Sequence, residues 1–252
     1  TFTMYLQTRQ YSQFILEGAV SEVLKIEQLD SYYGESRVIQ GLNLQAEQGK
    51  ITCLIGRNGV GKSTTLKSIM GLVKTPTGKI LLDGKDIIRM KTYDRVRLGI
   101  GYVPQGRDIF PQMTVQENIE LGLQAIGGKG KVPDYIYDLF PILPKFAKRK
   151  GGDLSGGQQP QLAIARALVA DPKILILDEP TEGIQPSIIE DIGDAIRKVN
   201  KEIGITVLIV EQYLDFVLGI SDYLYVMEKG NIVLKGKTSE MDPAEVQKMM
   251  TD

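Results

Sequence analysis

The sequence predicts an α/β fold with a mostly parallel sheet, and three observations support that class. Short apolar runs rich in Val, Ile and Leu alternate with longer helical patterns along most of the 252 residues. Hydrophobic residues make up 42% of the chain and charged residues 24%, which is enough for a core of ordinary size. No apolar run approaches the roughly 18 residues that a membrane-spanning helix requires. We therefore expect a globular chain that reaches a membrane only through a partner.

The predicted strands of the first half are short apolar runs, at residues 23–29, 38–46, 50–55, 79–82 and 100–103. A glycine-rich turn follows residue 55, and a helical pattern at residues 62–71 comes directly after it. From residue 114 to about residue 148 the pattern is helical and irregular, with a glycine-rich loop at residues 127–130.

In the second half, predicted helices alternate with predicted strands. The helices cover residues 156–169 and 187–202, and the strands cover residues 173–178 and 206–210. A hairpin is expected from residues 223–227 and 232–235, around the turn Lys229-Gly230-Asn231. Strands that alternate with helices favour a parallel sheet, and the helical stretch at about residues 106–157 is expected to be an inserted subdomain.

The residues that the chain lacks exclude several kinds of chemistry. Without histidine it can run neither a Ser-His-Asp nor a Cys-His mechanism, and it cannot build an imidazole metal site. Cys53 is the single cysteine, so no intrachain disulfide forms and a reducing compartment is favoured. The pI of about 5.8 gives no reason to expect a nucleic-acid partner.

Residues 1–22 are expected to be an N-terminal extension of unknown role. Their apolar patch, residues 14–20, is interrupted by Glu17 and lacks a basic flank, which argues against a signal peptide. The rest of the chain, residues 23–252, is expected to form a single domain.

The first chemical motif follows the predicted strand at residues 50–55. It fits the phosphate-loop pattern G-x4-G-K-[ST], and its residues are Gly56, Arg57, Asn58, Gly59, Val60, Gly61, Lys62, Ser63 and Thr64. The glycines let backbone N–H groups point at phosphate oxygens, at the positive end of the following helix. We expect Lys62 to reach the β- and γ-phosphates and Ser63 to ligate Mg²⁺. The alternative, a glycine-rich turn with a surface lysine, does not explain the strand-loop-helix setting.

The second motif is a pair of carboxylates, Asp178 and Glu179, directly after an apolar run. This places them at the carboxyl end of a central strand, where ligands bind in open α/β sheets. Asp178 is expected to partner Mg²⁺, and Glu179 to polarise an attacking water. A solvated acidic pair is the alternative, but a phosphate loop upstream favours nucleoside triphosphate hydrolysis, which needs both parts.

The third motif, Leu154-Ser155-Gly156-Gly157-Gln158, opens a predicted helix shortly before the acidic strand. Its N–H groups and the Ser155 hydroxyl can form a second anion-binding surface. Two such surfaces on one chain make sense if two ATPase subunits face each other and each completes the other's site. With these three motifs, about residues 23–240 resemble the ATP-binding subunits of ABC transporters.

The resemblance implies a P-loop NTPase fold of the ABC ATPase type. Its mostly parallel core would carry an antiparallel β subdomain and the inserted helical subdomain. Ser155, Gly156, Gly157 and Gln158 would bind the nucleotide of the partner subunit, and the insert, starting at residues 110–115, would grip the permeases.

The resemblance also implies roles for two further residues. Tyr33 matches the aromatic residue that stacks on adenine. Gln105 matches the glutamine that contacts Mg²⁺ and the attacking water. Ordinary surface packing for Tyr33 and an ordinary turn for Gln105 are the alternatives, and the spacing to the stronger motifs disfavours both.

Three departures from the family pattern narrow the resemblance. Glu211 and Gln212 stand where most members carry a histidine. A loop that usually ends in Asp is replaced by the run Glu182-Gly183-Ile184-Gln185-Pro186. The third departure is Pro160, which lies early in a predicted helix. The first two departures resemble the ATPases of branched-chain amino acid importers, and the urea-type second ATPase most of all. Gln212 is expected to bridge the γ-phosphate to the opposing subunit, with capping of the next helix as the alternative.

The resemblance therefore implies a subunit that binds ATP and Mg²⁺ and hydrolyses ATP to drive import of urea, short amides or branched-chain amino acids. The implied partners are a second ATPase, either a different chain or a second copy, two membrane permeases and, indirectly, a solute-binding protein. The implied location is peripheral, on the cytoplasmic face of the inner or plasma membrane. A soluble ABC ATPase acting on ribosomes or DNA, and an ATP-gated binding module without turnover, are the alternatives.

Overall fold

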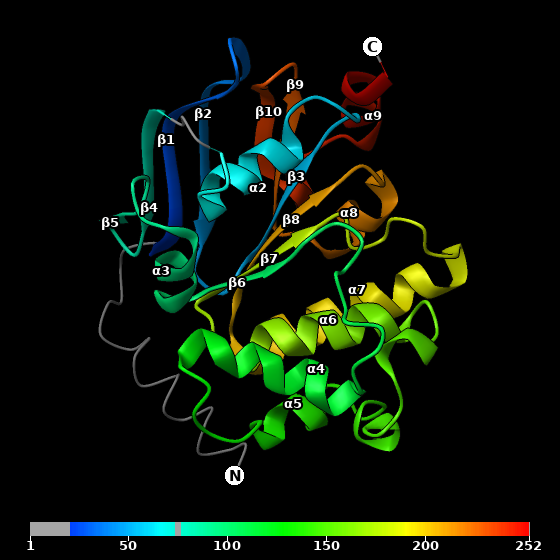
Figure 1. Cartoon of the computed structure of the whole chain (residues 1–252). Coiled ribbons are helices and arrows are strands. Elements are labelled where there is room, and N and C mark those ends of the chain that lie inside the picture. The colour runs from blue at the N-terminus through cyan, green and yellow to red at the C-terminus, as the bar shows by residue number, and fades with distance from the viewer. Residues whose placement is uncertain (1–20, 74–76, 252) are drawn as a thin grey trace.

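Two β-sheets organise the computed structural model, which describes residues 21–73 and 77–251 (Figure 1). The larger sheet has six strands in the order β10-β9-β3-β8-β7-β6. All of its neighbouring pairs are parallel except the β9–β10 hairpin. Its strands are β3 (Ile51–Ile55), β6 (Ile100–Val103), β7 (Ile174–Asp178), β8 (Thr206–Glu211), β9 (Tyr223–Glu228) and β10 (Asn231–Lys237).

The smaller sheet is antiparallel and has the order β2-β1-β4-β5. Its strands are β1 (Glu22–Tyr33), β2 (Ser36–Glu47), β4 (Thr77–Leu82) and β5 (Lys85–Asp86). The mostly parallel core and the antiparallel subdomain that the sequence predicted are thus both confirmed.

Helices cover both faces of the larger sheet (Figure 1). The helices are α2 (Lys62–Met70), α3 (Thr92–Arg97), α4 (Val115–Leu121), α5 (Asp134–Leu139), α6 (Gln158–Leu168), α7 (Pro186–Ile203), α8 (Leu214–Ile220) and α9 (Pro243–Thr251). Single 3-10 turns are η1 (Gly122–Ile126), η2 (Pro144–Phe146), η3 (Gly151–Asp153) and η4 (Thr238–Glu240). Across the described residues, none of these helices has the length and the apolar composition needed to cross a bilayer.

The two faces of the larger sheet belong to two separate hydrophobic clusters, because alternate residues of a strand point to opposite faces. On one face Leu54 packs with Leu66 and Ile69 of α2 and with apolar residues of the smaller sheet. On the other face Cys53 and Ile55 pack with apolar residues of α6, α7, α8 and the helical insert. Strand β3 is buried along its whole length, which fits a sequence that is apolar except for Thr52.

Several predicted boundaries are set by recognisable local signals. Helix α2 stops at Gly71, whose φ of 72° is the left-handed conformation that glycine adopts readily. Helix α7 begins with Pro186 in its first turn and ends at Gly204 in the same left-handed conformation. The β9–β10 turn uses Lys229 and Gly230, both with positive φ, as two-residue hairpins require.

The helical insert is less regular than one continuous pattern would suggest. Between β6 and α6 the chain forms α4, η1, α5, η2 and η3 as separate short pieces. Thr114 starts α4 with a reciprocal capping box, in which its side chain accepts from the Glu117 backbone and Glu117 accepts from the Thr114 backbone. The loop predicted at residues 127–130 lies between η1 and α5.

Two boundaries differ from the sequence-based expectation. Helix α6 begins at Gln158 and not at residue 156. Residues 1–20 lie outside the described chain, whereas Glu22, assigned to the N-terminal extension, is already the first residue of β1.

Candidate functional site

The predicted phosphate loop lies between the carboxyl end of β3 and the start of α2. Gly61 has a φ of 115°, and a Cβ atom there would lie 2.7 Å from Ile39 Cδ1. A Cβ on Gly56 would lie 2.4 Å from the Met227 carbonyl oxygen of β9. Gly61 is therefore required for its backbone angle, and Gly56 is required because a Cβ would collide with the backbone of β9. The loop is tight because the neighbouring strands pack directly against it.

Lys62 is buried at the centre of this loop. Its Nζ donates to the carbonyl oxygens of Gly56 at 2.8 Å and Arg57 at 3.0 Å, and it lies 3.4 Å from Glu179 Oε1. The two charged side chains are only 3% and 6% exposed. Because so little of the Lys62 side chain is exposed, these hydrogen bonds and the ion pair fix its position. They direct its charge into the loop where phosphate would bind.

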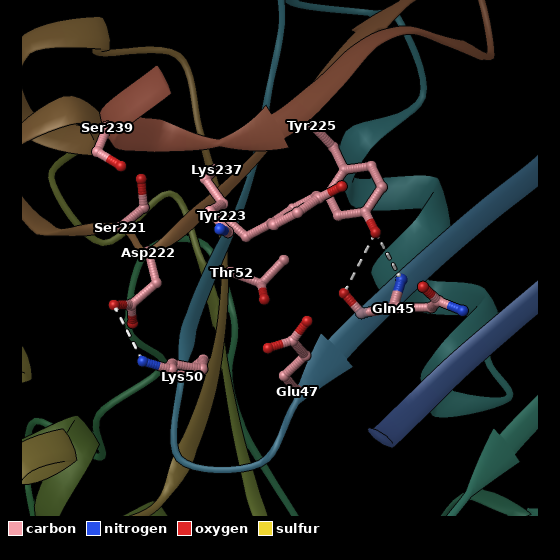
Figure 2. Close-up of a pocket in the computed structure, with 10 residues that line it drawn as sticks. All are labelled: Gln45, Glu47, Lys50, Thr52, Ser221, Asp222, Tyr223, Tyr225, Lys237 and Ser239. Atoms are coloured by element: carbon pink, nitrogen blue, oxygen red, sulfur yellow. Dashed lines mark hydrogen bonds and ion pairs between the residues drawn. The ribbon is translucent and has the colours of Figure 1, made fainter. Parts of the chain in front are cut away.

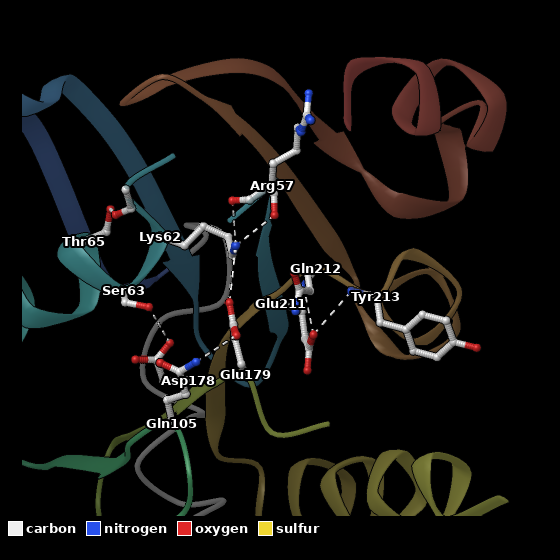
Figure 3. A network of polar contacts seen from close by, with 12 residues as sticks. Arg57, Lys62, Ser63, Thr65, Gln105, Asp178, Glu179, Glu211, Gln212 and Tyr213 are labelled. Carbon is white, nitrogen blue, oxygen red and sulfur yellow. Dashed lines mark hydrogen bonds and ion pairs between the residues drawn. The ribbon is translucent and has the colours of Figure 1, made fainter. Parts of the chain in front are cut away.

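Ser63 and Asp178 come from α2 and β7 and meet at 3.1 Å between the hydroxyl and Oδ1 (Figure 3). Tyr102 of β6 donates to the other carboxylate oxygen, Oδ2, at 3.2 Å. Burial raises the pKa of Asp178, and the hydrogen bonds from Ser63 and Tyr102 counteract only part of that rise. Nothing in the sequence singled out Tyr102, because its contact depends on β6 lying beside β7.

These oxygen donors fit Mg²⁺, which binds through one or two carboxylates together with substrate phosphates. Within the described residues, no group of three or more Cys, Asp or Glu side chains is placed to hold a metal ion by protein ligands alone. Ser63 and Asp178 would therefore hold the ion jointly with the nucleotide.

Glu179 follows β7 and lies between Lys62 and Gln105 (Figure 3). Gln105 Nε2 donates to Glu179 Oε2 at 3.3 Å, from the loop that follows β6. Burial raises the pKa of the Glu179 carboxyl, and the Lys62 charge lowers it in part. The structure thus brings together Lys62, Ser63, Gln105, Asp178 and Glu179, although they are far apart in the sequence.

Glu211, at the end of β8, is a buried carboxylate that fixes the loop after Glu179. Its Oε1 accepts from the Thr181 N–H at 3.0 Å and from the Thr181 hydroxyl at 2.6 Å. Its Oε2 accepts from the N–H groups of Gln212 at 2.8 Å and Tyr213 at 3.3 Å. The sequence marked Glu211 only as part of a departure from the family pattern, and its role as a link between two loops was missed.

Gln212 and Tyr33 have looser surroundings than the residues around Lys62. Gln212 donates to Glu211 through its backbone N–H, and Tyr213, the N-cap residue of α8, makes no side-chain capping bond, so no contact in the described residues supports a capping role for Gln212. Tyr33 ends β1 with half of its surface exposed, as a stacking platform requires. In the described part of the chain, neither side chain makes a hydrogen bond or ion pair with the phosphate loop.

The third motif precedes α6, which belongs to the helical side of the molecule (Figure 1). Ser155 N–H donates to Gln158 Oε1 at 3.1 Å, and its carbonyl accepts from the N–H groups of Gln158 and Gln159. A Cβ on Gly156 would meet nothing within 4 Å, so this surface is open. Pro160 is the third helical residue, where the missing N–H costs no helical bond.

Arg107 joins this motif to the loop after Glu179. Its NH1 donates to Gln159 Oε1 at 3.4 Å and its NH2 to the Glu182 carbonyl at 3.0 Å. Arg107 and Asp108 both have positive φ, and Arg166 of α6 donates to both of their carbonyl oxygens. No sequence pattern marks this link, since it rests on contacts between distant segments.

A groove of about 460 Å³ lies between the sheet core and the helical insert. Its lining includes Tyr93 and Phe110, which are about half exposed and are covered in part by the guanidinium groups of Arg97 and Arg166. Gly122 forms part of the wall, and a Cβ there would lie 2.1 Å from the Arg166 carbonyl oxygen. Exposed aromatic side chains beside arginines are typical of protein interfaces.

Comparison with known proteins gives a consistent result. A family model described as ABC transporter matches residues 39–182. A probable branched-chain amino acid transport ATP-binding protein of Archaeoglobus fulgidus is 37% identical over 222 residues, which cover 87% of this chain and 94% of the relative. A high-affinity branched-chain amino acid transport ATP-binding protein of Pseudomonas aeruginosa is 36% identical, over 84% of this chain and 91% of the relative.

Solved structures agree. The crystal structure of an ATP-binding cassette of an ABC transporter in its ADP conformation superposes with a TM-score of 0.76. That cassette is 32% identical to this protein, and the match covers 92% of this chain and 95% of the cassette. A dimeric bacterial ABC transporter cassette has a TM-score of 0.73 at 28% identity, over 85% of this chain and 98% of that one.

Proposed function

The chain belongs to the family of ABC transporter ATP-binding proteins, and from that premise we propose that it powers an importer of branched-chain amino acids. The family and its relatives make it an ATPase subunit of a transporter. The choice of solute is supported by the two relatives from Archaeoglobus fulgidus and Pseudomonas aeruginosa, whose names give branched-chain amino acid transport.

One observation supports the catalytic part of the proposal most directly. Lys62 and Glu179 form a buried ion pair, to which Gln105 donates a hydrogen bond, and Ser63 donates to Asp178 beside it. A cation for phosphate, oxygen donors for Mg²⁺ and a carboxylate for water are the parts that phosphoryl transfer to water needs.

In the mechanism, Lys62 and the N–H groups of residues 56–64 bind the phosphates of ATP. Bound Mg²⁺ would neutralise charge that develops on the phosphates. Glu179 orients the attacking water and accepts its proton, and its raised pKa makes the carboxylate a better base. Gln105 holds Glu179 from the opposite side, so a shift of the loop after β6 changes the position of Glu179.

A second subunit is proposed to complete the site. The surface of Ser155, Gly156, Gly157 and Gln158 makes no hydrogen bond to the phosphate loop of its own chain within the described residues, so it would serve the nucleotide of a partner. A dimeric cassette among the structural relatives supports this arrangement. We propose a different ATPase chain as the partner, with a second copy as the alternative.

The groove beside the helical insert is the proposed contact with the permeases. Its half-exposed aromatic residues would take an apolar helix end, and its lining includes Tyr102, which also binds Asp178. A permease helix in this groove would therefore contact Tyr102, which in turn contacts Asp178 of the proposed metal site. Attachment through permeases would place the subunit on the cytoplasmic face of the membrane, with a solute-binding protein as an indirect partner.

Urea or a short amide remains a second candidate solute, because of the run Glu182-Gly183-Ile184-Gln185-Pro186. Uptake of labelled leucine and of labelled urea into vesicles that hold the complete transporter separates the two. Leucine uptake driven by ATP is the expected result, and urea uptake without leucine uptake would replace the proposed solute.

Lys62→Ala tests the ATPase assignment. Arg57 of the same loop directs its guanidinium group away from Asp178 and Glu179 (Figure 3), so it does not replace Lys62, and we expect loss of most ATP binding or turnover, measured by nucleotide titration and by phosphate release. If both stayed near the wild-type values, the site would have been assigned wrongly. Copurification of the tagged chain with permeases would exclude the soluble alternative.

A further inference from the structure

A cavity of about 330 Å³ lies at the amino end of β3, whereas the phosphate loop follows its carboxyl end (Figure 2). The walls come from β2, β3, β9, β10 and η4, which are far apart in the sequence. The lining residues are Gln45, Glu47, Lys50, Thr52, Ser221, Asp222, Tyr223, Tyr225, Lys237 and Ser239. The cavity shares no lining residue with the ATP site.

Thr52 is a polar residue in an otherwise apolar strand, and only 1% of it is exposed. It lies on the same face of β3 as Leu54, since the two are separated by one residue. Its hydroxyl makes no hydrogen bond with the described residues, and Figure 2 shows it directed into the cavity. Since no fully buried side-chain oxygen or nitrogen among the described residues lacks a partner, this hydroxyl is open to the cavity, where a ligand can reach it.

Glu47 supplies the unpaired charge of the cavity. It is half-buried at the end of β2, and it forms neither an ion pair nor a side-chain hydrogen bond within residues 21–73 and 77–251. Its carboxylate points into the same cavity as the Thr52 hydroxyl (Figure 2). A partly desolvated carboxylate is stabilised by a cation that can also donate hydrogen bonds.

The two tyrosines form an aromatic wall beside Glu47. The ring centroids of Tyr223 and Tyr225 are 5.1 Å apart, with the planes tilted by 46°. The Tyr225 hydroxyl accepts from the Gln45 N–H at 3.0 Å, and burial raises the pKa of Tyr225 to about 12, which keeps the phenol uncharged. Uncharged aromatic faces attract cations and cover short apolar chains.

The lysines of the cavity are already paired. Lys50 lies 3.7 Å from Asp222 and Lys237 lies 3.3 Å from Glu240, and both side chains are more than half exposed. Each of these lysines thus has a carboxylate partner at the exposed rim, whereas Glu47 has no cationic partner among the described residues. The cavity as a whole favours a cation over an anion.

We propose that this cavity binds a small primary ammonium compound with a short apolar chain. The ammonium group would donate to the Glu47 carboxylate and the Thr52 hydroxyl, and the apolar chain would lie against Tyr223 and Tyr225. The rim lysines, Lys50 and Lys237, would also accommodate a carboxylate on the same molecule, so an amine and an α-amino acid are two sources of the same chemistry.

The test is calorimetric titration of the full chain with three compounds that share the same isobutyl group. Isopentylamine carries the ammonium group alone, leucine carries the ammonium and a carboxylate, and 4-methylpentanoate carries the carboxylate alone. We expect saturable binding of isopentylamine and none of 4-methylpentanoate. Leucine binding that is tighter than that of isopentylamine would show that the rim lysines take part, and absence of leucine binding would restrict the site to amines.

Two variants locate the binding. Glu47→Gln keeps the size and removes the charge, so isopentylamine should bind about tenfold more weakly or worse, the scale of a hydrogen bond to a charged group. Thr52→Val should weaken binding by a smaller factor. Glu202→Gln, at a half-buried glutamate of α7 outside the cavity, is the matched control and should bind as the wild type does.

ATP binding, measured on the same samples, shows that each variant is folded. The proposal is overturned if isopentylamine does not bind at millimolar concentrations. It is equally overturned if Glu47→Gln binds isopentylamine as well as the wild type, or if 4-methylpentanoate binds as tightly as the amine.

Discussion

Glu179 has a backbone conformation that a glutamate rarely adopts, with a φ of 47°. The left-handed region costs an L-residue roughly 1–2 kcal/mol, so the surrounding contacts have to hold it. Its N–H donates to the Val210 carbonyl oxygen at 2.9 Å, and its carboxylate contacts Lys62 and Gln105. Strain of this kind concentrates at functional sites, and it supports the proposed action of Glu179 on water.

Glu179→Gln should leave ATP binding intact and nearly stop turnover, because the amide cannot accept the proton of the attacking water. Loss of a general base typically costs about 10²–10⁴-fold in rate. Phosphate release by the complete transporter measures it, with ATP titration on the same preparation. A normal rate would remove Glu179 from the mechanism.

Gln212→Ala should cost less than Glu179→Gln. An amide has a donor and an acceptor but no charge, so Gln212 can bridge to the γ-phosphate without acting as acid or base. Loss of a hydrogen bond to a charged group corresponds to about 1.5–3 kcal/mol of transition-state stabilisation. The two variants should be assayed side by side in the complete transporter, where an unchanged rate in Gln212→Ala would leave this residue without a catalytic role.

Glu211→Gln should destabilise the fold, because one of its acceptor oxygens becomes a donor that faces N–H groups. The carboxylate accepts from Thr181 on one side and from Gln212 and Tyr213 on the other. An unsatisfied buried group costs about 1–3 kcal/mol, and urea unfolding of the nucleotide-free chain measures it. Glu202→Gln is the control, and equal midpoints for both variants would refute the link between the two loops.

The residues of the ATP site could be predicted to very different degrees. Lys62, Ser63, Asp178 and Glu179 lie in local motifs whose spacing has a direct physical reason, and the structure brings them together. Tyr102, Arg107 and Glu211 act through contacts between distant segments. A single sequence holds no signal for such contacts, because they depend on which strands become neighbours.

At the scale of single elements, the β1–β2 pair shows how one carboxylate supports a strand irregularity. Asp30 Oδ1 accepts from the Gly41 N–H at 2.7 Å and from Arg37 NH2 at 2.6 Å. Gly41 has a φ of 65°, and the register between the two strands shifts near Leu29. The Arg37 guanidinium holds the pKa of Asp30 below its ordinary value of 3.8.

Asp30→Asn should lower stability at neutral pH by less than about 1 kcal/mol, since the pair is partly exposed. A carboxyl whose pKa is lowered by folding contributes stability above its unfolded pKa and loses it as the pH falls through the folded value. The difference between wild type and variant should thus be present at pH 7 and shrink below about pH 4. Thermal unfolding across this range measures it, and a difference that does not change with pH would contradict the role of the charge.

Helices and strands were predicted correctly where the segment was apolar, was long, or had Pro or Gly at its ends. Strands β3, β6 and β7 are short, mostly apolar runs, and α7 is marked by Pro186 and Gly204 at its ends. Helix α3 was missed, because its six residues give too little periodicity to separate a helix from a loop, and α8 was expected only as a helix without bounds after Gln212. Strand β5, with two residues, exists only through its pairing with β4.

At the scale of the whole molecule, the ATP site and the surface of Ser155, Gly156, Gly157 and Gln158 belong to different parts of the fold. The first lies at the ends of β3 and β7, and the second opens α6 on the helical side. Arg107 connects the two, through Gln159 and the Glu182 carbonyl. A subunit arranged in this way holds one nucleotide and offers a surface to another, so the account requires a partner for full activity.

Steady-state phosphate release tests this requirement most directly. The isolated chain should hydrolyse ATP weakly, and addition of the second ATPase and the permeases should raise the rate per chain. Lys62→Ala in this chain should remove a large part of the gain. An isolated monomer that is already fully active, with no gain from its partners, would contradict the account.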